Sequence, residues 1–565
     1  MDPQALRIRE AGDSALLVEW EEVIDPQVNG RAVAVAAAIR NASLPGVRDV
    51  VPTFRSVAIY FDPLKAEPGV FRDALSRVGG PVPHVLEGRT IEVPIAYGGE
   101  AGPDLATIAE WAGISAAEVA ERHADAEYRV FMLGFLPGFA YLGPVDPVIA
   151  APRRDTPRLR VPVGSVGIAG RQTGIYPRES AGGWQIIGRS ALKVFDPGRV
   201  PAALFSPGDT VHFRVDASRD VTPEQPKDQG STLPIETLSR TISVMRPGLF
   251  TTIQDRGRWG HQASGVSVSG AVDLVSHRVA NLLVGNEADA ATLEVTLVGP
   301  ELRIEGPARI AVAGADLRPS IDGATVRMGA PVACRAGSVL RFGERATGAR
   351  AYLAFDGGID TPLVLGSRAT HVGAALGGLD GRALRAGDRL PLGVSGRVRP
   401  LRTIAHVKGS DPKVAGGARL RVMPGPQDDF FPEAAFALLE RSRFIVTPQS
   451  NRMGYRLSGT AVPRIPNREM ISDAAFVGGI QVPASGEPIL LMAAPVAQPA
   501  IATDNTIGSR KSRLVALAIR DDVDTAWNAE RKIVIGYALI FLQILEPERR
   551  FTALAIPCGQ RANLE

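Results

Sequence analysis

Cysteine is scarce in this chain. Its 565 residues include two, Cys334 and Cys558, which lie far apart in the sequence. Neither a disulfide framework nor a cysteine-based metal site follows from so few, which fits a reducing compartment. The seven histidines are scattered and give no support to a histidine metal centre. We therefore expect a cytoplasmic protein without a bound metal ion.

The sequence also lacks a long hydrophobic run and an excess of one charge. Its most apolar segment, 533–545, is shorter than the roughly 20 residues of a membrane-spanning helix, and residues 1–10 contain no signal-peptide core. The 63 basic and 60 acidic residues leave a net charge of +3, which gives no argument for binding nucleic acid. We expect neither a membrane nor a nucleic acid as partner.

Several motifs with a known mechanism are missing. The sequence has no G-x-x-x-x-G-K-[ST] phosphate loop, no H-E-x-x-H zinc motif and no G-x-S-x-G nucleophile elbow. A biotin-attachment site of the Met-Lys-Met type is also missing. Any chemistry must therefore come from other residues.

Glycine and proline are abundant, with 60 and 44 residues. They predict many turns between short strands. The apolar fraction of 45% and the charged fraction of 22% are typical of a globular protein, and the length predicts roughly three or four domains.

Periodicity and turn signals divide the chain. Residues 1–82 alternate strands at 15–20, 47–52 and 56–61 with helices at 28–39 and 68–78, which predicts a small α+β domain of the split βαβ kind. Many short strands predict a β-barrel at 83–215, with one helix from 104 to 123. The remaining expected parts are a polar linker at 216–240, β-rich halves at 241–405 and 406–515, and an atypical tail at 516–565.

One helix is clear in the half at 241–405. Val272, Val275, Val279 and Leu282 fall on one apolar face, and Gly285 is expected to end the helix. Asp273 and His277 lie one helical turn apart on it. A solvated ion pair is favoured there over a catalytic dyad.

Phe131 to Asp146 is the most distinctive stretch. Its aromatic residues alternate with glycines and prolines, which break helices and strands. The pattern indicates a strand that leaves the core and turns sharply, with Phe135, Phe139 and Tyr141 on a rigid wall. Two interpretations stay open on this stretch alone: a turn covered by aromatic side chains, and one wall of a binding cleft.

Polar groups recur beside turn glycines at three places. Arg171, Gln172 and Thr173, with Tyr176 and Arg178 nearby, offer a guanidinium fork, an amide and hydroxyl groups, which suit a carboxylate, a phosphate or an amide ligand. The other two clusters are Asp255–Arg256 beside Gly257 and Asn451–Arg452 beside Gly454–Tyr455. A single cluster fits a solvated turn, whereas three favour a composite ligand site.

These stretches resemble two known families in order along the chain. Residues 135–142 (FLPGFAYL) and 169–177 (AGRQTGIYP) are similar to the allophanate hydrolase subunit 1, or KipI-like, family. The sequence resembles the subunit 2, or KipA-like, family at 251–257 (TTIQDRG), 269–273 (SGAVD), 281–286 (NLLVGN), 293–296 (LEVT) and 450–456 (SNRMGYR). Both are similar to the B and C subunits of bacterial ATP-dependent 5-oxoprolinase and to the carboxyltransferase region of urea carboxylase.

The resemblance implies a mainly β fold with α+β parts, in which cyclophilin-like β-barrel domains are preceded by the small split βαβ-like domain. It also implies a fusion of two genes at the linker. The implied reaction is ATP-driven opening of 5-oxo-L-proline to L-glutamate, a small lactam substrate, with a separate A subunit of the LamB/YcsF type. ATP is then the expected cofactor, and a homo-oligomer stays open.

Such a reaction needs an amide carbonyl activated by phosphorylation before water attacks. Under the resemblance, Arg171 and Arg256 stabilise anionic oxygens, and Asp273 or Glu294 does acid–base work. The full set of residues expected to bind substrate comprises Phe135, Pro137, Gly138, Tyr141, Arg171, Gln172, Thr173, Tyr176, Asp255, Arg256, Asn451, Arg452 and Tyr455.

After Ala494 the sequence departs from this pattern. The family usually continues with a loop similar to DRQTTGGYP, whereas this chain reads PVAQPAIAT at 495–503. A shifted reading frame or a diverged tail would explain the difference. Either would remove the second half's counterpart of the 171–176 loop.

Two other functions compete with the hydrolase. Carboxyl transfer from carboxybiotin to an amide or urea-like acceptor would require biotin, with separate biotin carboxylase and carrier proteins. A non-catalytic regulator, as the KipI and KipA names suggest, would bind a histidine kinase without turnover. Neighbouring genes for an A subunit or for a biotin carboxylase would discriminate the two enzymes.

Overall fold

The computed structural model describes residues 7–78, 88–216, 240–395, 417–466, 471–492, 502–506 and 513–518. Nearly all of the linker expected at 216–240 lies outside these residues, as does the tail beyond 518. Most of the departing stretch 495–503 is outside them as well.

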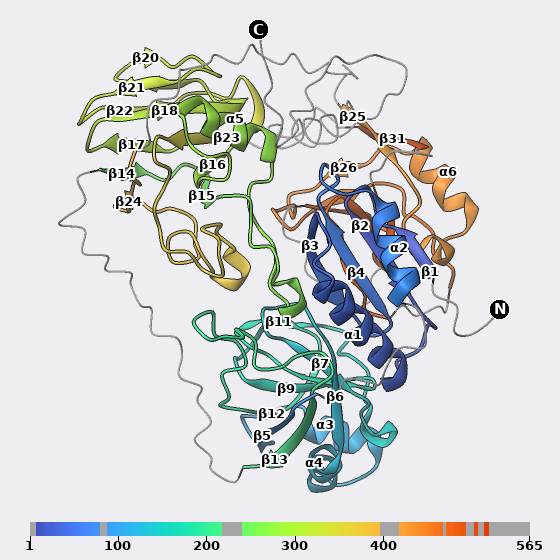
Figure 1. The fold of residues 1–565 in the computed structure, drawn as a ribbon. Helices are drawn as coiled ribbons and strands as arrows, with labels where there is room; N and C mark the ends of the chain where they lie inside the picture. The colour runs from blue at the N-terminus through green and yellow to red at the C-terminus, as the bar shows by residue number, and fades with distance from the viewer. Residues whose placement is uncertain are drawn as a thin grey trace.

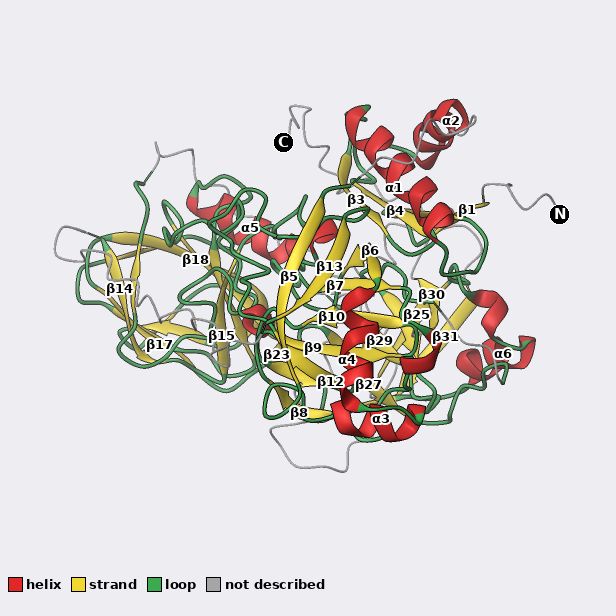
Figure 2. Ribbon diagram, turned by 90° about the horizontal axis from the view of Figure 1, so that it is seen from below, coloured by secondary structure: helices red, strands yellow, loops and turns green. Residues whose placement is uncertain are grey.

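The N-terminal unit is an antiparallel sheet with two helices. Its elements are β1 (Arg7–Glu10), β2 (Ala15–Glu19), α1 (Pro26–Asn41), β3 (Val47–Pro52), β4 (Ser56–Phe61) and α2 (Pro68–Val78). The strand order is β1-β2-β4-β3, and all neighbours are antiparallel. Consequently β2 and β3, which α1 connects, are parallel to each other with β4 between them. This is the split βαβ arrangement that the sequence predicted, and α1 packs on β3 and β4 beside α2 (Figure 2).

The second unit contains a closed barrel. Its elements are β5 (Thr90–Tyr97), α3 (Leu105–Ala112), α4 (Ala116–Asp125), β6 (Glu127–Leu133), β7 (Ala140–Gly143), η1 (Pro147–Ile149), β8 (Arg158–Val161), β9 (Ser165–Ala169), β10 (Gln172–Ile175), β11 (Ser180–Gly182), β12 (Gln185–Arg189) and β13 (Thr210–Val215). The barrel runs β10-β7-β6-β13-β5-β12-β9, with β11 and β8 in a separate ribbon. The predicted barrel is therefore confirmed. Side chains such as Val93, Tyr128 and Ile168 fill its interior.

The single helix expected from 104 to 123 is wrong, because the chain forms two. Gly113 adopts a left-handed φ of 69° and ends α3, as glycine commonly does just beyond a helix C-terminus. Ser115 then caps α4, its side chain accepting a hydrogen bond from the Glu118 amide at 3.1 Å.

The third unit consists of two sheets around a shared core. Its elements are β14 (Thr241–Arg246), β15 (Phe250–Gln254), η3 (Gln262–Ser264), α5 (Leu274–Val284), β16 (Thr292–Thr296), β17 (Glu301–Ile304), β18 (Ala308–Asp316), β19 (Pro319–Ile321), β20 (Ala324–Thr325), β21 (Val332–Cys334), β22 (Val339–Phe342), β23 (Thr347–Phe355), η4 (Val372–Ala374) and β24 (Arg389–Pro391). The sheets run β20-β19-β22-β17-β14-β24 and β15-β16-β23-β18-β21. In this part of the chain, which was expected to be the first of two β-barrel halves, the strands form two sheets.

Helix α5 packs on β18 and β23 and ends at Gly285, as predicted. The face expected from the apolar periodicity is nevertheless wrong, because Val275 is 51% and Leu282 is 47% exposed. The buried face instead combines Ala280 and Leu283 with polar His277 and Asn281, which hydrogen-bond within the core.

The fourth unit is built from β25 (Gly417–Val422), η5 (Asp428–Phe430), α6 (Glu433–Arg441), β26 (Ile445–Val446), β27 (Gly454–Ser458), β28 (Gly479–Val482), β29 (Ile489–Leu491), β30 (Ala502–Thr506) and β31 (Arg513–Ala518). A five-stranded sheet runs β26-β27-β29-β28-β30, and β25 pairs with β31. Within the described residues these strands do not close into a barrel.

The N-terminal unit contacts all three other units, and Figure 1 shows its sheet in blue between the barrel and the C-terminal strands in orange. Asn29 donates to the Phe131 carbonyl of the barrel at 2.9 Å. Asp49 accepts hydrogen bonds from the amides of Gly260 and Gln262, and the Tyr60 hydroxyl donates to the Ala475 carbonyl. The N-terminal unit thus fixes the relative positions of the others.

Candidate functional site

The aromatic stretch forms a strained loop between β6 and β7. Phe135 has a φ of 64°, a left-handed conformation that costs energy for any residue except glycine. Its ring meets those of Phe139 and Tyr176 edge to face, with centroids 5.5 and 6.3 Å away. Phe139 and Tyr141 are buried, whereas Phe135 is only half-buried. Phe135 is therefore the aromatic residue of this loop that a ligand could contact.

This loop packs directly against the third unit. Pro137 is buried, and the Gly138 amide donates to the Ser264 carbonyl at 2.9 Å. A Cβ atom on Gly265 would lie 2.7 Å from the Leu136 carbonyl oxygen, so glycine is required for the close approach. Figure 1 shows the η3 segment in green descending to the barrel. We call this contact between 134–139 and 261–266 the junction.

Arg171, Gln172 and Thr173 do not gather around Tyr176. Arg171 is exposed and donates to the Val145 carbonyl at 3.4 Å, at the opposite end of β10 from Tyr176. Thr173 lies inside the barrel, where its hydroxyl contacts His123 Nε2 at 2.9 Å. Gln172 is half-buried, and its Oε1 atom has no hydrogen-bond partner. The structure thus separates the members of this predicted cluster.

Burial also makes His123 a neutral polar group of the barrel core. Desolvation lowers the pKa of its imidazole to about 3. The ring therefore holds Thr173 and the Tyr97 hydroxyl without carrying a charge.

Asp255 and Arg256 have different surroundings. The Asp255 carboxylate accepts hydrogen bonds from the Gly257 amide, the Ser367 hydroxyl and the Arg368 amide. It therefore holds the loop at 367–368 against β15. The Arg256 side chain is 64% exposed and pairs with Asp289 at 3.0 Å.

Asp273 and His277 are buried and do not form the solvated ion pair that was favoured. Asp273 caps α5, accepting hydrogen bonds from the amide and the hydroxyl of Ser276 at 2.8 and 2.5 Å. His277 contacts the Thr292 hydroxyl instead. Burial raises the pKa of the Asp273 carboxyl and lowers that of His277 to about 4.

Glu294 is the centre of a buried ionic network. It is fully buried on β16 and accepts hydrogen bonds from the Tyr352 hydroxyl at 2.8 Å and the Val272 amide at 2.9 Å. Arg452 Nη1 approaches its Oε1 atom to 2.5 Å, and Arg350 Nε lies 3.6 Å from the same atom. Two guanidinium groups from different units therefore enclose one carboxylate.

The 450–456 motif supplies one of these groups. Asn451 Oδ1 accepts hydrogen bonds from the amides of Met453 and Gly454, which sets the turn before β27. This turn directs Arg452 to Glu294 and to the Gly270 carbonyl. The Tyr455 hydroxyl accepts from Arg350 at 2.6 Å. Of the predicted set, Asp273, Glu294, Arg452 and Tyr455 are thus brought together around 270–273.

The network keeps Arg350 charged. Burial alone would lower the pKa of its guanidinium, but the Tyr455 hydroxyl and the Glu294 carboxylate raise it above the ordinary value. Sequence reasoning missed Arg350 and Tyr352 because neither lies in a motif, and only the pairing of β16 with β23 places them beside Glu294.

Arg258 and His371 were also missed. Arg258 follows the 251–257 motif and is 1% exposed, although arginine is rarely buried. His371 is 7% exposed at the start of η4. His371 lies in the turn-rich loop 366–371, a sequence signal that could have found it. Arg258 lies outside that loop and contacts its Ala369 carbonyl only in the fold.

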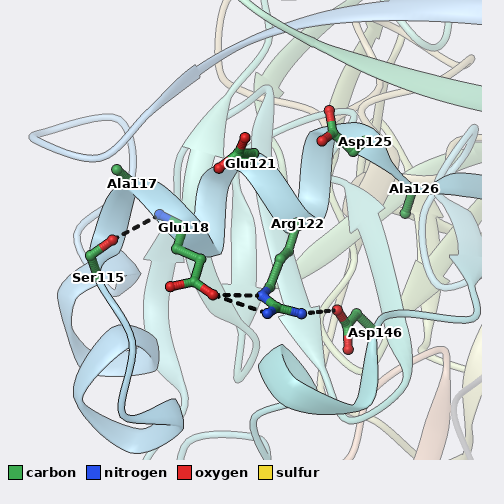
Figure 3. A pocket seen from close by; sticks show the side chains of 8 residues that line it. All are labelled: Ser115, Ala117, Glu118, Glu121, Arg122, Asp125, Ala126 and Asp146. Carbon is green, nitrogen blue, oxygen red and sulfur yellow. Dashed lines mark hydrogen bonds and ion pairs between the residues drawn. The ribbon is translucent and has the colours of Figure 1, made fainter.

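A separate pocket lies on the outside of the barrel, along α4 (Figure 3). Its lining residues are Ser115, Ala117, Glu118, Glu121, Arg122, Asp125, Ala126 and Asp146. Arg122 bridges Glu118 and Asp146 there. None of the predicted site residues lines this pocket, so we place the candidate site at the junction and the Glu294 network instead.

Two carboxyltransferase-domain family models match the chain. Subdomains C and D match residues 6–205, and subdomains A and B match residues 264–496. The second match ends close to Ala494, where the sequence departs from the pattern described above. The chain belongs to this carboxyltransferase-domain family, with the C/D and A/B parts fused in one polypeptide.

Two relatives within this family are components of 5-oxoprolinase. The chain is 40% identical over 251 residues to the C-type subunit of 5-oxoprolinase from Escherichia coli (strain K12), which covers 44% of this chain and 79% of that protein. It is 41% identical over 223 residues to the B-type subunit of 5-oxoprolinase from Bacillus subtilis (strain 168), covering 37% and 91%. The resemblance to the B and C subunits is confirmed.

Urea amidolyase of Saccharomyces cerevisiae is also similar, at 35% identity over 225 residues, or 39% of this chain and 12% of that protein. The crystal structure of TTHA0988 has the same fold, with a TM-score of 0.76 and 32% identity over 91% of this chain and 100% of that chain.

Two negative findings apply to the described residues. No helix among them is long and apolar enough to cross a membrane. They also contain no group of three or more His, Cys, Asp or Glu side chains placed to hold a metal ion.

Proposed function

We propose that this chain is a fused B/C-type component of an ATP-dependent 5-oxoprolinase, which hydrolyses 5-oxo-L-proline to L-glutamate with a separate A subunit of the LamB/YcsF type. The observation that carries the proposal is that one polypeptide is about 40% identical to most of a B-type and most of a C-type 5-oxoprolinase subunit. The same proposal includes a cyclophilin-like character for the barrel domains and the domain limits given above.

The contact between the two parts supports this assignment. The 135–142 motif and the segment 261–266 pack together at the junction, so a site built from both parts is available within one chain. In a two-subunit enzyme the same contact would be intermolecular. The fusion removes the entropic cost of bringing the two parts together.

Ring opening requires a general acid or base and groups that stabilise anionic oxygens. In this proposal Asp273 is the better suited acid–base group, because burial raises the pKa of its carboxyl. Glu294 faces Arg350 and Arg452 and is better suited to positioning Arg452. ATP is bound by the assembled complex.

The test is ATP-dependent glutamate release from 5-oxo-L-proline by the full chain, with and without the A subunit. We expect glutamate only from the complete mixture. A correctly assembled complex that releases no glutamate would exclude the proposal.

Variants of the chain locate the site within this assay. Phe135→Ala is expected to lower kcat/KM, whereas Leu159→Ala, on a side chain that is 89% exposed in β8, is expected to leave it unchanged. Arg171→Ala tests the oxyanion role that the resemblance gave to Arg171. Unchanged turnover in that variant would remove Arg171 from the site.

Carboxyl transfer is the second candidate, favoured by the similarity to urea amidolyase and by the family itself. It predicts that the chain transfers a carboxyl group from carboxybiotin to an amide acceptor when biotin carboxylase and carrier proteins are supplied. Glutamate release without biotin would reject it.

A further inference from the structure

Arg258 is a buried cation without a carboxylate partner. Its Nε donates to the Val364 carbonyl at 3.0 Å and its Nη2 to the Ala369 carbonyl at 2.7 Å, while Nη1 has no hydrogen-bond partner. Asp255 is close by, but its oxygens already accept three other hydrogen bonds. A buried charge is costly unless it is paired, so an anion bound at this guanidinium would be stabilising.

His371 presents a second unused donor from the same loop. Its Nδ1 accepts a hydrogen bond from the Ala374 amide at 3.1 Å, so the proton of the neutral ring is on Nε2. Nε2 is buried and has no partner. An N–H group left unsatisfied inside a protein is destabilising because its lost hydration is not replaced, and a bound acceptor would remove that cost.

The surroundings of these two donors are positively charged. Desolvation and the charges of Arg258, Arg452 and Arg178 all lower the pKa of His371, to about 4. Arg178 belongs to the barrel and also has a buried Nε atom without a partner. Cations from three units therefore act electrostatically on His371.

A glycine of the loop that carries His371 lies against the Arg258 side chain. A Cβ atom on Gly377 would lie 2.4 Å from Arg258 Nη2, so a larger residue would displace the guanidinium. The backbone of the loop that carries His371 thus lies directly against the Arg258 guanidinium.

We propose that Arg258 Nη1 and His371 Nε2–H form an oxyanion-binding subsite beside the junction, which takes a carboxylate or a phosphate group. Guanidinium and N–H donors suit both anions. The assignment of this anion to the lactam carboxylate or to a phosphoryl group of ATP rests on the proposed function. The binding itself does not, because it is measured without turnover.

The test is calorimetric titration of the full chain with inorganic phosphate and, separately, with acetate. We expect the unaltered chain to bind at least one of them. Tighter phosphate binding identifies a phosphoryl subsite, and tighter acetate binding identifies a carboxylate subsite. Binding of neither anion at concentrations up to about 10 mM, which would detect millimolar affinity, overturns the proposal.

Two variants localise the binding. Arg258→Lys keeps the charge but loses the planar fork, and we expect about tenfold weaker binding. His371→Asn keeps a side-chain acceptor for the Ala374 amide but lacks the Nε2 donor, and we expect about three- to tenfold weaker binding. Arg303→Lys, an exposed arginine on β17, is the matched control and should bind like the unaltered chain.

Affinities that stay unchanged in both variants, with circular dichroism showing native folds, would overturn the subsite. The results also separate this inference from the proposed function. Anion binding that both variants weaken, without any glutamate release from the complete mixture, would keep the subsite and reject the reaction.

Discussion

Breaking the Glu294 network is expected to destabilise the chain strongly. We consider Arg452→Met, which removes the guanidinium group and keeps an unbranched side chain. The Arg452 side chain is 13% exposed, and the Glu294 side chain that it pairs with is 0% exposed. Removing one partner of a buried ion pair costs about 3–5 kcal/mol, because the other charge is left uncompensated. Glu294 would retain Arg350, Tyr352 and the Val272 amide, so we expect a loss near 3 kcal/mol, the lower end of that range.

Glu294→Gln should cost more, about 5 kcal/mol, because it leaves Arg350 and Arg452 buried without a carboxylate between them. When Arg452→Met and Glu294→Gln are combined, the ion pair between these two residues is lost only once. Its destabilisation should therefore be smaller than the sum of the two single effects, by up to about 3 kcal/mol.

Urea unfolding, followed by tryptophan fluorescence, measures these free energies. Arg456→Met is the matched control, since Arg456 lies on β27, directly after the turn that carries Arg452, with an exposed side chain, and it should change stability by less than about 0.5 kcal/mol. If Arg452→Met destabilised the chain no more than Arg456→Met, the Glu294 network would not hold the two units together.

Three further predictions concern the loops and the N-terminal unit. Phe135→Gly relieves a φ of 64° and should leave the unfolding midpoint unchanged or raised, yet lower kcat/KM in the glutamate assay; unchanged kinetics would remove Phe135 from the ligand wall. Gly265→Ala should destabilise the chain by more than Gly260→Ala. The Cβ atom at position 265 would lie 2.7 Å from the Leu136 carbonyl oxygen, whereas the Cβ atom at position 260 meets nothing within 4 Å at a similar φ. Equal midpoints of the two variants in thermal unfolding would contradict the close contact at the junction. Burial and the neighbouring Asp473 raise the pKa of Glu19 from 4.5 to about 7. The unfolded chain therefore loses this proton at lower pH than the folded chain does. As a result, the free energy of unfolding should fall by up to about 3 kcal/mol between pH 4.5 and 7. Glu19→Gln should flatten that slope in urea titrations at several pH values, and an unaltered slope would assign it to other groups.

Local pattern predicted the N-terminal unit well. The strands Val47–Pro52 and Ser56–Phe61 and the helix Pro68–Val78 have the predicted limits, because alternation and the proline that begins the helix act over a few residues. The break at Gly113 was missed, although a glycine followed by a serine cap is a local signal. The strand Arg7–Glu10 was missed too.

The buried face of α5 could not be predicted from apolar spacing. His277 and Asn281 occupy that face because Thr292 and the Ala290 carbonyl satisfy them, and these partners come from another part of the chain. Apolar periodicity cannot recognise a polar residue whose hydrogen bonds are made in the tertiary structure.

The candidate site also could not be predicted from local sequence patterns alone. Glu294 and Arg452 were selected individually from motifs, but their pairing joins residues far apart in sequence. Arg258 was passed over in favour of Arg256, since both follow the same aspartate and only the fold shows that Arg258 is buried while Arg256 pairs with Asp289 on the surface.

We propose that this chain works as the joined B and C parts of a 5-oxoprolinase. The most direct measurement follows glutamate and ADP together in a mixture of the full chain, the A subunit, ATP and 5-oxo-L-proline. We expect equal amounts of glutamate and ADP, with neither formed when the chain or the A subunit is omitted. ADP release without glutamate, or no turnover from an intact complex, would contradict it.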